Sequence, residues 1–130
     1  MNMRQGCLSG DFRPLKDINF NTVFLSSISR VANCCDFEIC GAVTADKLYF
    51  FKNSSKNPKE AFVVNPAEYI NFYGDINFFF HSHCLGSAVP SEVDIAIADE
   101  LLRPFLIYSS KDENFSFYNP KSQKSIYFSL

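Results

Sequence analysis

The chain has 130 residues, which suits one ordinary domain and is too short for two. Apolar residues make up 47% of the sequence and charged residues 20%, a composition that excludes an intrinsically disordered chain. The net charge is −2 and the basic residues are scattered, so no basic face is predicted and we expect no nucleic-acid partner.

The N-terminal residues 1–17 are polar and contain glycine and proline, which predicts an irregular arm or a short edge strand before the rest of a single domain spanning 1–130. Met1–Lys16 lacks the apolar core of a signal peptide. No apolar run approaches the roughly 20 residues that a membrane-spanning helix needs. We therefore expect a cytoplasmic protein without a membrane partner.

An amphipathic helix is predicted to begin at Asn19 and to end around Cys34 or Cys35. Its apolar residues recur at three- and four-residue spacing, which favours a helix with one buried face. These residues are Phe20, Val23, Phe24, Ile28, Val31 and Ala32.

A β-hairpin is predicted next, with strands at Ile39–Thr44 and Lys47–Lys52 and a turn at Ala45-Asp46. The polar, proline-containing segment Asn53–Glu60 is predicted to be a loop.

Two short elements are then expected before the centre of the chain. Ala61–Val64 is predicted to be a strand. Ala67–Tyr73 is predicted to be a short helix, because Pro66 suits a first helical turn and Gly74 suits a helix end.

The most apolar predicted strand is Ile76–His83, whose three consecutive phenylalanines indicate burial on both faces. A loop at Cys84–Val89, a helix at Ser91–Leu102, a strand at Phe105–Ser109 and a hairpin of Asn114–Tyr118 with Ser125–Phe128 complete the chain. This order predicts an α/β fold in which helices sandwich a mixed β-sheet.

The five cysteines are Cys7, Cys34, Cys35, Cys40 and Cys84. Their odd number, the adjacent pair and the lack of a C-x-x-C spacing argue against a disulfide framework. We expect reduced thiols, mostly buried as small hydrophobic residues.

A candidate metal site follows from His81 and His83, the only histidines of the chain, at the end of a predicted strand. Residues two apart in a strand point to the same face, so both imidazoles can converge on one point. Asp94, eleven residues after His83, adds a carboxylate from the first turn of the next predicted helix. Two histidines and one carboxylate form a three-ligand set for a catalytic zinc that leaves one position for water.

Each half of this pattern also has a purely structural interpretation. A His-x-His sequence can simply end a strand in solvent. Ser91 and Asp94, after Pro90, have the spacing of a helix capping box, in which the serine caps and the acidic residue reaches back. The two signals together, in this order, favour a metal site.

The string H-S-H at 81–83, seven further residues and S-x-x-D at 91–94 resemble the signature of the JAMM (MPN+) metallopeptidases without a gap. Upstream, Glu38 in the string E-I-C-G is similar to the E-x-C-G context of bacterial and phage members, although Asp36 is a nearby alternative. The segments Phe62–Pro66 and Phe105–Ser109 also lie where such proteins place similar ones, so that the resemblance covers roughly residues 20–110.

The resemblance implies a JAMM/MPN architecture, similar to that of cytidine deaminases, and a role for each matched residue. His81, His83 and Asp94 would bind Zn2+. Glu38 would take a proton from the attacking water and pass it to the leaving amine, and the Ser91 hydroxyl would stabilise the oxyanion. Without the motif, Glu38 is equally well an ordinary exposed residue before a strand.

One position departs from the family pattern, because members often carry proline directly after the second histidine and this chain has Cys84. The thiol can be a packed loop residue or an additional, inhibitory zinc ligand. The departure concerns substrate access more than metal binding.

As a function, the resemblance implies a zinc metallopeptidase that hydrolyses a peptide or isopeptide bond in a protein or peptide substrate. The motif context looks most like the phage and bacterial branch, so we expect a part in phage tail assembly, with tail proteins as partners and an association with the virion. A cell-wall peptidase partner is expected to be a separate chain, since no second domain follows Leu130.

Three other functions are compatible with parts of the sequence. The chain can be a peptidase for the tails of ubiquitin-like or sulfur-carrier proteins. A non-catalytic MPN scaffold module is disfavoured because all five ligand and catalytic positions are present. A zinc-dependent deaminase is disfavoured because the P-C-x-x-C string is missing.

Overall fold

A computed structural model describes residues 20–130, so the expectations for the N-terminal arm, the helix start at Asn19 and Cys7 lie outside the described residues. The helices are α2 (Thr22–Asn33), α3 (Glu92–Leu101) and two 3-10 helices, η1 (Pro66–Glu68) and η2 (Ile70–Asp75). The strands are β1 (Cys40–Val43), β2 (Leu48–Phe51), β3 (Phe78–His83), β4 (Phe105–Ser109), β5 (Asn114–Asn119) and β6 (Lys124–Phe128).

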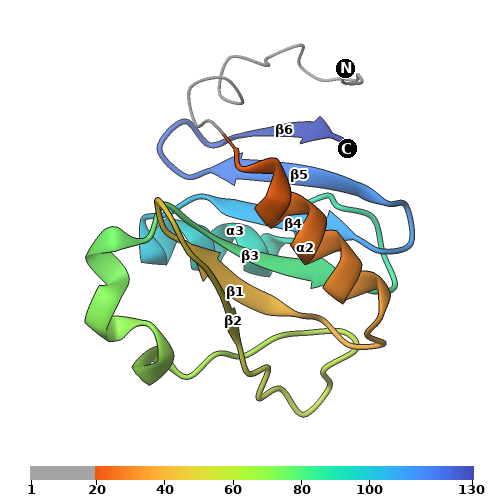
Figure 1. The fold of residues 1–130 in the computed structure, drawn as a ribbon, viewed down its shortest axis with the longest axis horizontal. Coiled ribbons are helices and arrows are strands. Elements are labelled where there is room, and N and C mark those ends of the chain that lie inside the picture. The colour runs from red at the N-terminus through yellow and green to blue at the C-terminus, as the bar shows by residue number, and fades with distance from the viewer. Residues whose placement is uncertain (1–19) are drawn as a thin grey trace.

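The six strands form one mixed sheet in the order β2-β1-β3-β4-β5-β6, with α2 on one face and α3 on the other (Figure 1). The central pair β3–β4 is parallel and the other four pairs are antiparallel. Helix α3 provides the crossover that a parallel pair needs. The prediction of an α/β fold with a mixed sheet between helices is confirmed.

The predicted helix is confirmed as α2, but its buried face differs from the predicted one. It begins after Asn21, whose side-chain oxygen accepts hydrogen bonds from two N–H groups of the first turn at 2.9 and 3.2 Å. The buried residues are Leu25, Ile28 and Ala32, whereas Val23 is 67% exposed. Val23 lies five residues before Ile28, which is roughly 140° around a helix and therefore on the opposite side.

Strand β3 lies at the centre of the sheet and is buried on both faces, as its apolar run predicts. Phe78 and Phe80 pack in the core beneath α2, and Phe79 packs in the core beneath α3. Because side chains alternate along a strand, His81 lies on the same face as Phe79. The predicted strand at Phe105–Ser109 and the two hairpins are also confirmed.

The predicted strand at Ala61–Val64 is wrong, because this segment is irregular and does not join the sheet. Its backbone groups pair locally instead of with a strand. The Val63 carbonyl accepts a hydrogen bond from Ser54 N at 2.8 Å, and Val63 N donates to Asn53 Oδ1 at 3.1 Å.

The predicted helix at Ala67–Tyr73 is corrected to the two 3-10 helices η1 and η2. The backbone leaves the helical region at Tyr69 (φ −129°) and at Phe72 (φ −127°). Both rings pack onto aromatic residues of the sheet, Tyr69 on Phe79 with centroids 5.1 Å apart and Phe72 on Tyr49 at 4.4 Å. Packing of these rings thus overrides the helical pattern.

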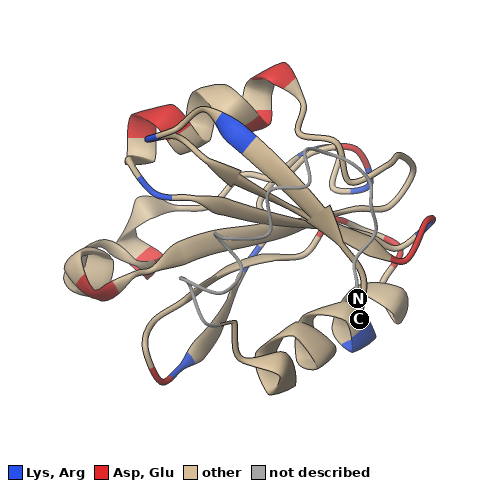
Figure 2. Ribbon diagram, turned by 90° about the horizontal axis from the view of Figure 1, so that it is seen from above, with Lys and Arg blue, Asp and Glu red and all other residues tan. Residues whose placement is uncertain are grey.

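Within residues 20–130, no helix has the length and apolar character that crossing a membrane requires. In the six strands Lys124 is the one residue among Lys, Arg, Asp and Glu, and the others within residues 20–130 lie on helices and loops (Figure 2). Four cysteines in this part of the chain are free thiols, but only Cys40 is fully buried and Cys34 is exposed. The expectation of mostly buried cysteines is therefore wrong for the described residues.

Gly41 lies where the sheet leaves no room for a side chain. A Cβ atom there would lie 1.9 Å from the Tyr49 carbonyl oxygen and 2.4 Å from Cζ of Phe80. The Phe80 ring covers this glycine and meets the Phe50 ring edge-on, with centroids 5.4 Å apart. Glycine here allows a large aromatic side chain to fill the core above β1.

We predict that Gly41→Ala lowers the free energy of unfolding by about 3 kcal/mol, because the backbone and the Phe80 ring must both move. Gly74→Ala is the matched control, since a Cβ there meets nothing within 4 Å; it should change stability by less than about 1 kcal/mol. Urea denaturation of both variants measures the difference. Equal stabilities would contradict the tight packing described for β1.

Candidate metal centre

The two histidines lie at the end of β3, on the sheet face that α3 covers. His81 is fully buried and His83 is partly buried. Strand β1 runs antiparallel beside them with Cys40 opposite His81, and the same register places Glu38 opposite His83. The strand ends therefore gather two imidazoles and one carboxyl group on one face.

Asp94 reaches this point from the first turn of α3. Ser91 caps the helix: its Oγ accepts a hydrogen bond from Asp94 N at 3.0 Å, and Ser91 N donates to Asp94 Oδ2 at 2.9 Å. The capping box that the spacing allows is thus present, and it fixes the carboxylate relative to the helix.

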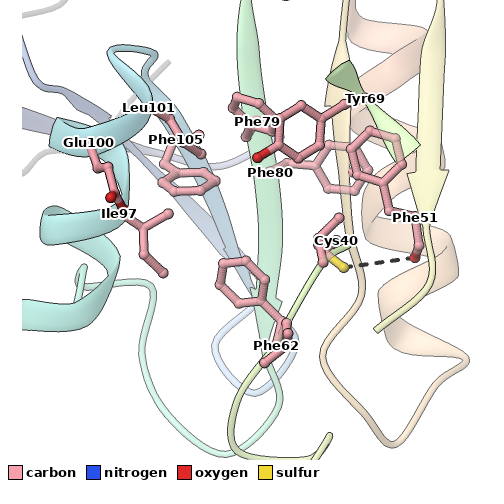
Figure 3. Close-up of a pocket in the computed structure, with 13 residues that line it drawn as sticks. Cys40, Phe51, Phe62, Tyr69, Phe79, Phe80, Ile97, Glu100, Leu101 and Phe105 are labelled. Atoms are coloured by element: carbon pink, nitrogen blue, oxygen red, sulfur yellow. Dashed lines mark hydrogen bonds between the residues drawn. The ribbon is translucent and has the colours of Figure 1, made fainter. Parts of the chain in front are cut away.

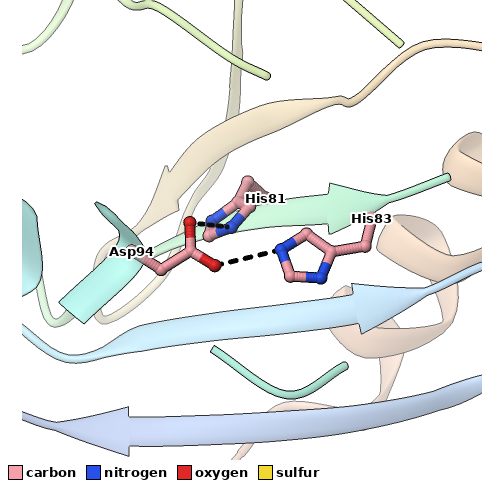
Figure 4. A group of neighbouring side chains, drawn as sticks. All are labelled: His81, His83 and Asp94. Atoms are coloured by element: carbon pink, nitrogen blue, oxygen red, sulfur yellow. Dashed lines mark hydrogen bonds and ion pairs between the residues drawn. The ribbon is translucent and has the colours of Figure 1, made fainter. Parts of the chain in front are cut away.

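The same carboxylate also faces both imidazoles (Figure 4). Nε2 of His81 lies 3.0 Å from Asp94 Oδ1, and Nε2 of His83 lies 3.0 Å from Oδ2. One donor atom from each residue lies within 4.8 Å of the others, so the cluster can hold a metal ion. The cap and the ligand interpretation of Asp94 are therefore compatible, because one side chain has both sets of contacts.

The tautomer of His83 is set by the loop that follows β3. Its Nδ1 lies 2.6 Å from the carbonyl oxygen of Ser87. A carbonyl oxygen only accepts, so Nδ1 carries a proton. Nε2 donates to Asp94 Oδ2 when it is protonated, and it is the atom left to bind a cation when it is not. A backbone carbonyl in this position is typical of histidines that bind metals.

The environment of His81 leaves its ring nitrogens without aligned partners. Neither nitrogen has a hydrogen bond of acceptable geometry. Nε2 lies 3.0 Å from Asp94 Oδ1, but the two groups are not aligned as a hydrogen bond requires. The ring is stacked on Phe62, with centroids 4.4 Å apart, and meets the edge of Phe105 at 5.2 Å. A buried polar atom without a partner is costly, and a cation at the three donors would supply a partner for Nε2.

Burial and mutual contact also set the charges of the three residues. Burial lowers the pKa of His81 and outweighs the opposing contact with Asp94. Burial acts in the same direction on His83, but the bonds to Asp94 and Ser87 outweigh it and raise its pKa. Burial alone would raise the pKa of Asp94, yet the close contacts with both imidazoles hold it well below its usual range. Asp94 is therefore ionised and His81 is neutral near pH 7.

Glu38 is 5% exposed, which contradicts its interpretation as an ordinary exposed residue. Burial raises its pKa to about 7; the charge of His83 opposes this shift and that of Asp94 adds to it. Asp36, the alternative acid, has an 84% exposed side chain and pairs with Lys59 at 3.7 Å. Of the two acids, only Glu38 is placed to exchange a proton at the site.

A cavity of about 570 Å³ opens over the cluster, and its walls include Glu38, His83, Ser91 and Asp94. The Ser91 hydroxyl accepts from Asp94 N, so its own proton is available to a further acceptor. The structure thus gathers all five residues singled out from the sequence. Three surround a possible cation, and Glu38 and Ser91 line the space beside it.

Two further residues that position the site were missed from the sequence. Ser109 on β4 and Ser116 on β5 are fully buried, and their hydroxyls donate to the carbonyls of Gly86 (2.8 Å) and Ala88 (2.5 Å). Together with the His83–Ser87 contact, three consecutive carbonyls of the loop are bonded to side chains of the sheet. Serine at inward positions of strands that are otherwise apolar was the available signal.

Cys84 lies outside the group of three donors, although it follows His83 directly. It is half-buried, and burial raises the pKa of its thiol, with the charge of Glu38 acting in the same direction. A protonated thiol is a poor metal ligand. Of the two expectations for Cys84, these observations favour the packed loop residue.

Comparisons with known proteins find similar structures but no similar sequence family. No family model matches the chain, and no curated protein matches it. A protein from Desulfitobacterium hafniense, whose structure was determined in solution, is similar with 18% identity and a TM-score of 0.63, over 84% of this chain and 88% of that one. A JAB1/MPN domain protein from Archaeoglobus fulgidus is similar with 19% identity and a TM-score of 0.53, over 82% and 92%. At these identities the comparison shows a shared JAB1/MPN fold.

We predict that the chain binds about one Zn2+ and that its affinity falls as the pH drops. His83 must lose a proton to bind, and its raised pKa means that this competition begins above pH 6.5. Below that pKa the affinity should fall roughly tenfold per pH unit, as measured by titration against a chelator at pH 6, 7 and 8.

Two variants check the assignment of the ligands. His83→Ala should lose most of the zinc, whereas Cys84→Ala should retain it because the thiol lies outside the donor group. Wild-type protein without metal affinity would overturn the site, and zinc loss in Cys84→Ala would show that the thiol is a ligand.

Proposed function

We propose that this chain is a zinc-dependent peptidase that hydrolyses an amide bond with a water molecule. The observation that carries the proposal is that a buried carboxyl group, Glu38, lines the same cavity as His83 and Asp94 of the three-residue cluster. A metal site with a proton acceptor beside it is a hydrolytic arrangement. The JAB1/MPN fold of a structural neighbour supports the same class of activity.

Two neutral imidazoles and one carboxylate suit Zn2+, and zinc held by His81, His83 and Asp94 would activate a water molecule and polarise a carbonyl. Glu38 accepts a proton from the attacking water as the new carbon–oxygen bond forms. When the carbon–nitrogen bond breaks, Glu38 returns that proton to the leaving amine. Burial, which raises the pKa of Glu38 in the metal-free protein, favours a group that can both accept and return a proton.

Ser91 acts on the oxygen of the scissile carbonyl. Its hydroxyl is held at the N-terminus of α3 by the bond from Asp94 N, so its proton can point into the cavity. A donor fixed in advance stabilises the negative charge that develops on the carbonyl oxygen. The N-terminus of α3, which carries partial positive charge, adds to this effect.

The walls of the cavity favour a protein or peptide substrate. Leu85 and Val93 line it with side chains that are 63% and 66% exposed. Exposed apolar residues around a polar centre suit the side chains of a polypeptide. A role in phage tail assembly, or on the tails of ubiquitin-like or sulfur-carrier proteins, stays a prediction from the sequence resemblance.

We predict that Glu38→Gln retains zinc but loses hydrolysis by about 10²–10⁴-fold, because the amide cannot accept the proton. Asp36→Asn is the matched control, since it removes an exposed carboxylate two residues away and should leave the rate unchanged. Metal content and the rate of peptide hydrolysis are measured on the same samples. Loss of zinc in Glu38→Gln would make Glu38 a ligand, and full activity would remove it from the mechanism.

We predict that Ser91→Gly separates helix capping from catalysis. Glycine caps a helix nearly as well as serine, so the free energy of unfolding should fall by only a few tenths of a kcal/mol. Hydrolysis should still fall by about 10²–10³-fold, because the donor to the oxyanion is lost. Thermal unfolding and kcat provide the two readouts, and a kcat equal to the wild type would restrict Ser91 to its cap.

A further inference from the structure

A second cavity, of about 260 Å³, lies beside the site cavity and shares two wall residues with it, Phe62 and Ile97 (Figure 3). It is enclosed by the sheet, by α3 and by the segment that leads into η2. Phe62 stacks on the ring of His81 and also lines this second cavity. The second cavity therefore begins at the wall of the candidate metal centre.

The lining of this aromatic pocket is almost entirely apolar. Its rings come from Phe51, Phe62, Tyr69, Phe79 and Phe105. Burial raises the pKa of Cys40 to about 12, and the negative charges of Glu68 and Glu38 act in the same direction. The thiol is therefore uncharged, and its Sγ donates to the Phe51 carbonyl oxygen at 3.8 Å. Glu100 is the one charged residue among the described lining residues, and it lies on the exposed side of α3.

We propose that the aromatic pocket is a specificity subsite that takes one large apolar side chain, aromatic or leucine-like, of a polypeptide substrate. The inference rests on the proposed function, because that substrate's scissile amide would lie in the adjoining cavity. The volume suits one side chain better than a whole ligand. Aromatic walls favour an apolar occupant, since an unpaired polar group would lose its hydration there.

The geometry also explains why the two cavities would act together. A side chain in the aromatic pocket packs against Phe62, and Phe62 lies on His81. Ile97 comes from the same face of α3 as Asp94, one helical turn further on, and forms the other part of the shared wall. Binding in the pocket therefore places the substrate backbone beside the cluster.

The first experiment tests the pocket without catalysis. Metal-free, full-length protein is titrated with N-acetyl-phenylalaninamide and with N-acetyl-lysinamide, and NMR records the shifts of the pocket's aromatic protons. We expect saturable shifts with the phenylalanine probe at about tenfold lower concentration than with the lysine probe. Equal or stronger binding of the lysine probe would overturn the proposal.

Two valine variants identify the site of binding. Val64→Phe fills the pocket from its half-buried wall and should abolish the shifts, whereas Val23→Phe, on the exposed side of α2, should not. Shifts that persist in a folded Val64→Phe protein would overturn the proposal, as would wild-type shifts confined to residues outside the pocket.

The second experiment uses zinc-loaded protein and a peptide library with one position varied at a time. We expect one position near the cleaved bond to favour phenylalanine, tyrosine or leucine by about tenfold or more in kcat/KM over glycine and lysine. Cleavage without that preference would overturn the subsite and leave the peptidase proposal standing. Absence of cleavage together with probe binding in the pocket would reject the peptidase and retain the pocket as an apolar binding site.

Discussion

The carboxylate of Asp94 is held from two sides, and the arrangement of the site depends on that double contact. From α3 it receives the N–H of Ser91, and from β3 it meets the imidazoles of His81 and His83. Helix α3 follows β3 in the chain and forms the crossover from β3 to the parallel strand β4. The distance between the donors is consequently set by the packing of α3 on the sheet, which is more rigid than a loop.

The loop between β3 and α3 has no regular secondary structure, and hydrogen bonds from side chains of the sheet hold it in place. Ser109 and Ser116 bind its carbonyls from beneath, while His83 binds the carbonyl between them. Each hydroxyl is fully buried and has a partner, so the polar network satisfies itself within an apolar sheet. The ring orientation of His83 is thereby tied to β4 and β5 as well as to its own strand.

Most of the sheet and both α-helices could be predicted from the sequence, because their patterns are local. Three successive phenylalanines indicated a central strand, and the Ser91–Asp94 spacing marked a helix start whether or not a metal binds. Segments whose conformation depends on distant contacts could not be predicted. Ala61–Val64 has the sequence pattern of a strand, but the Asn53 side chain takes up a hydrogen bond of its backbone. The conformation of η2 depends on the packing of its Phe72 ring on Tyr49 of the sheet.

The candidate site divides in the same way. The convergence of His81 and His83 followed from the two-residue period of a strand. The burial of Glu38 and the orphaned nitrogens of His81 depend on residues brought together only by folding, such as Phe62 and Phe105. The aromatic pocket combines residues from seven separate segments, and no spacing along the chain signals it.

The double contact of Asp94 also has an evolutionary consequence. In a lineage that stopped using the metal, mutations at His81 or His83 would remove a buried polar ring and would be free to accumulate. A mutation at Asp94 would still remove half of the capping box of α3, and selection for a folded domain would act against it. In such descendants the aspartate would be retained longer than the histidines. An aspartate without the histidine pair would then indicate common descent, and the histidine pair would indicate that the metal is still used.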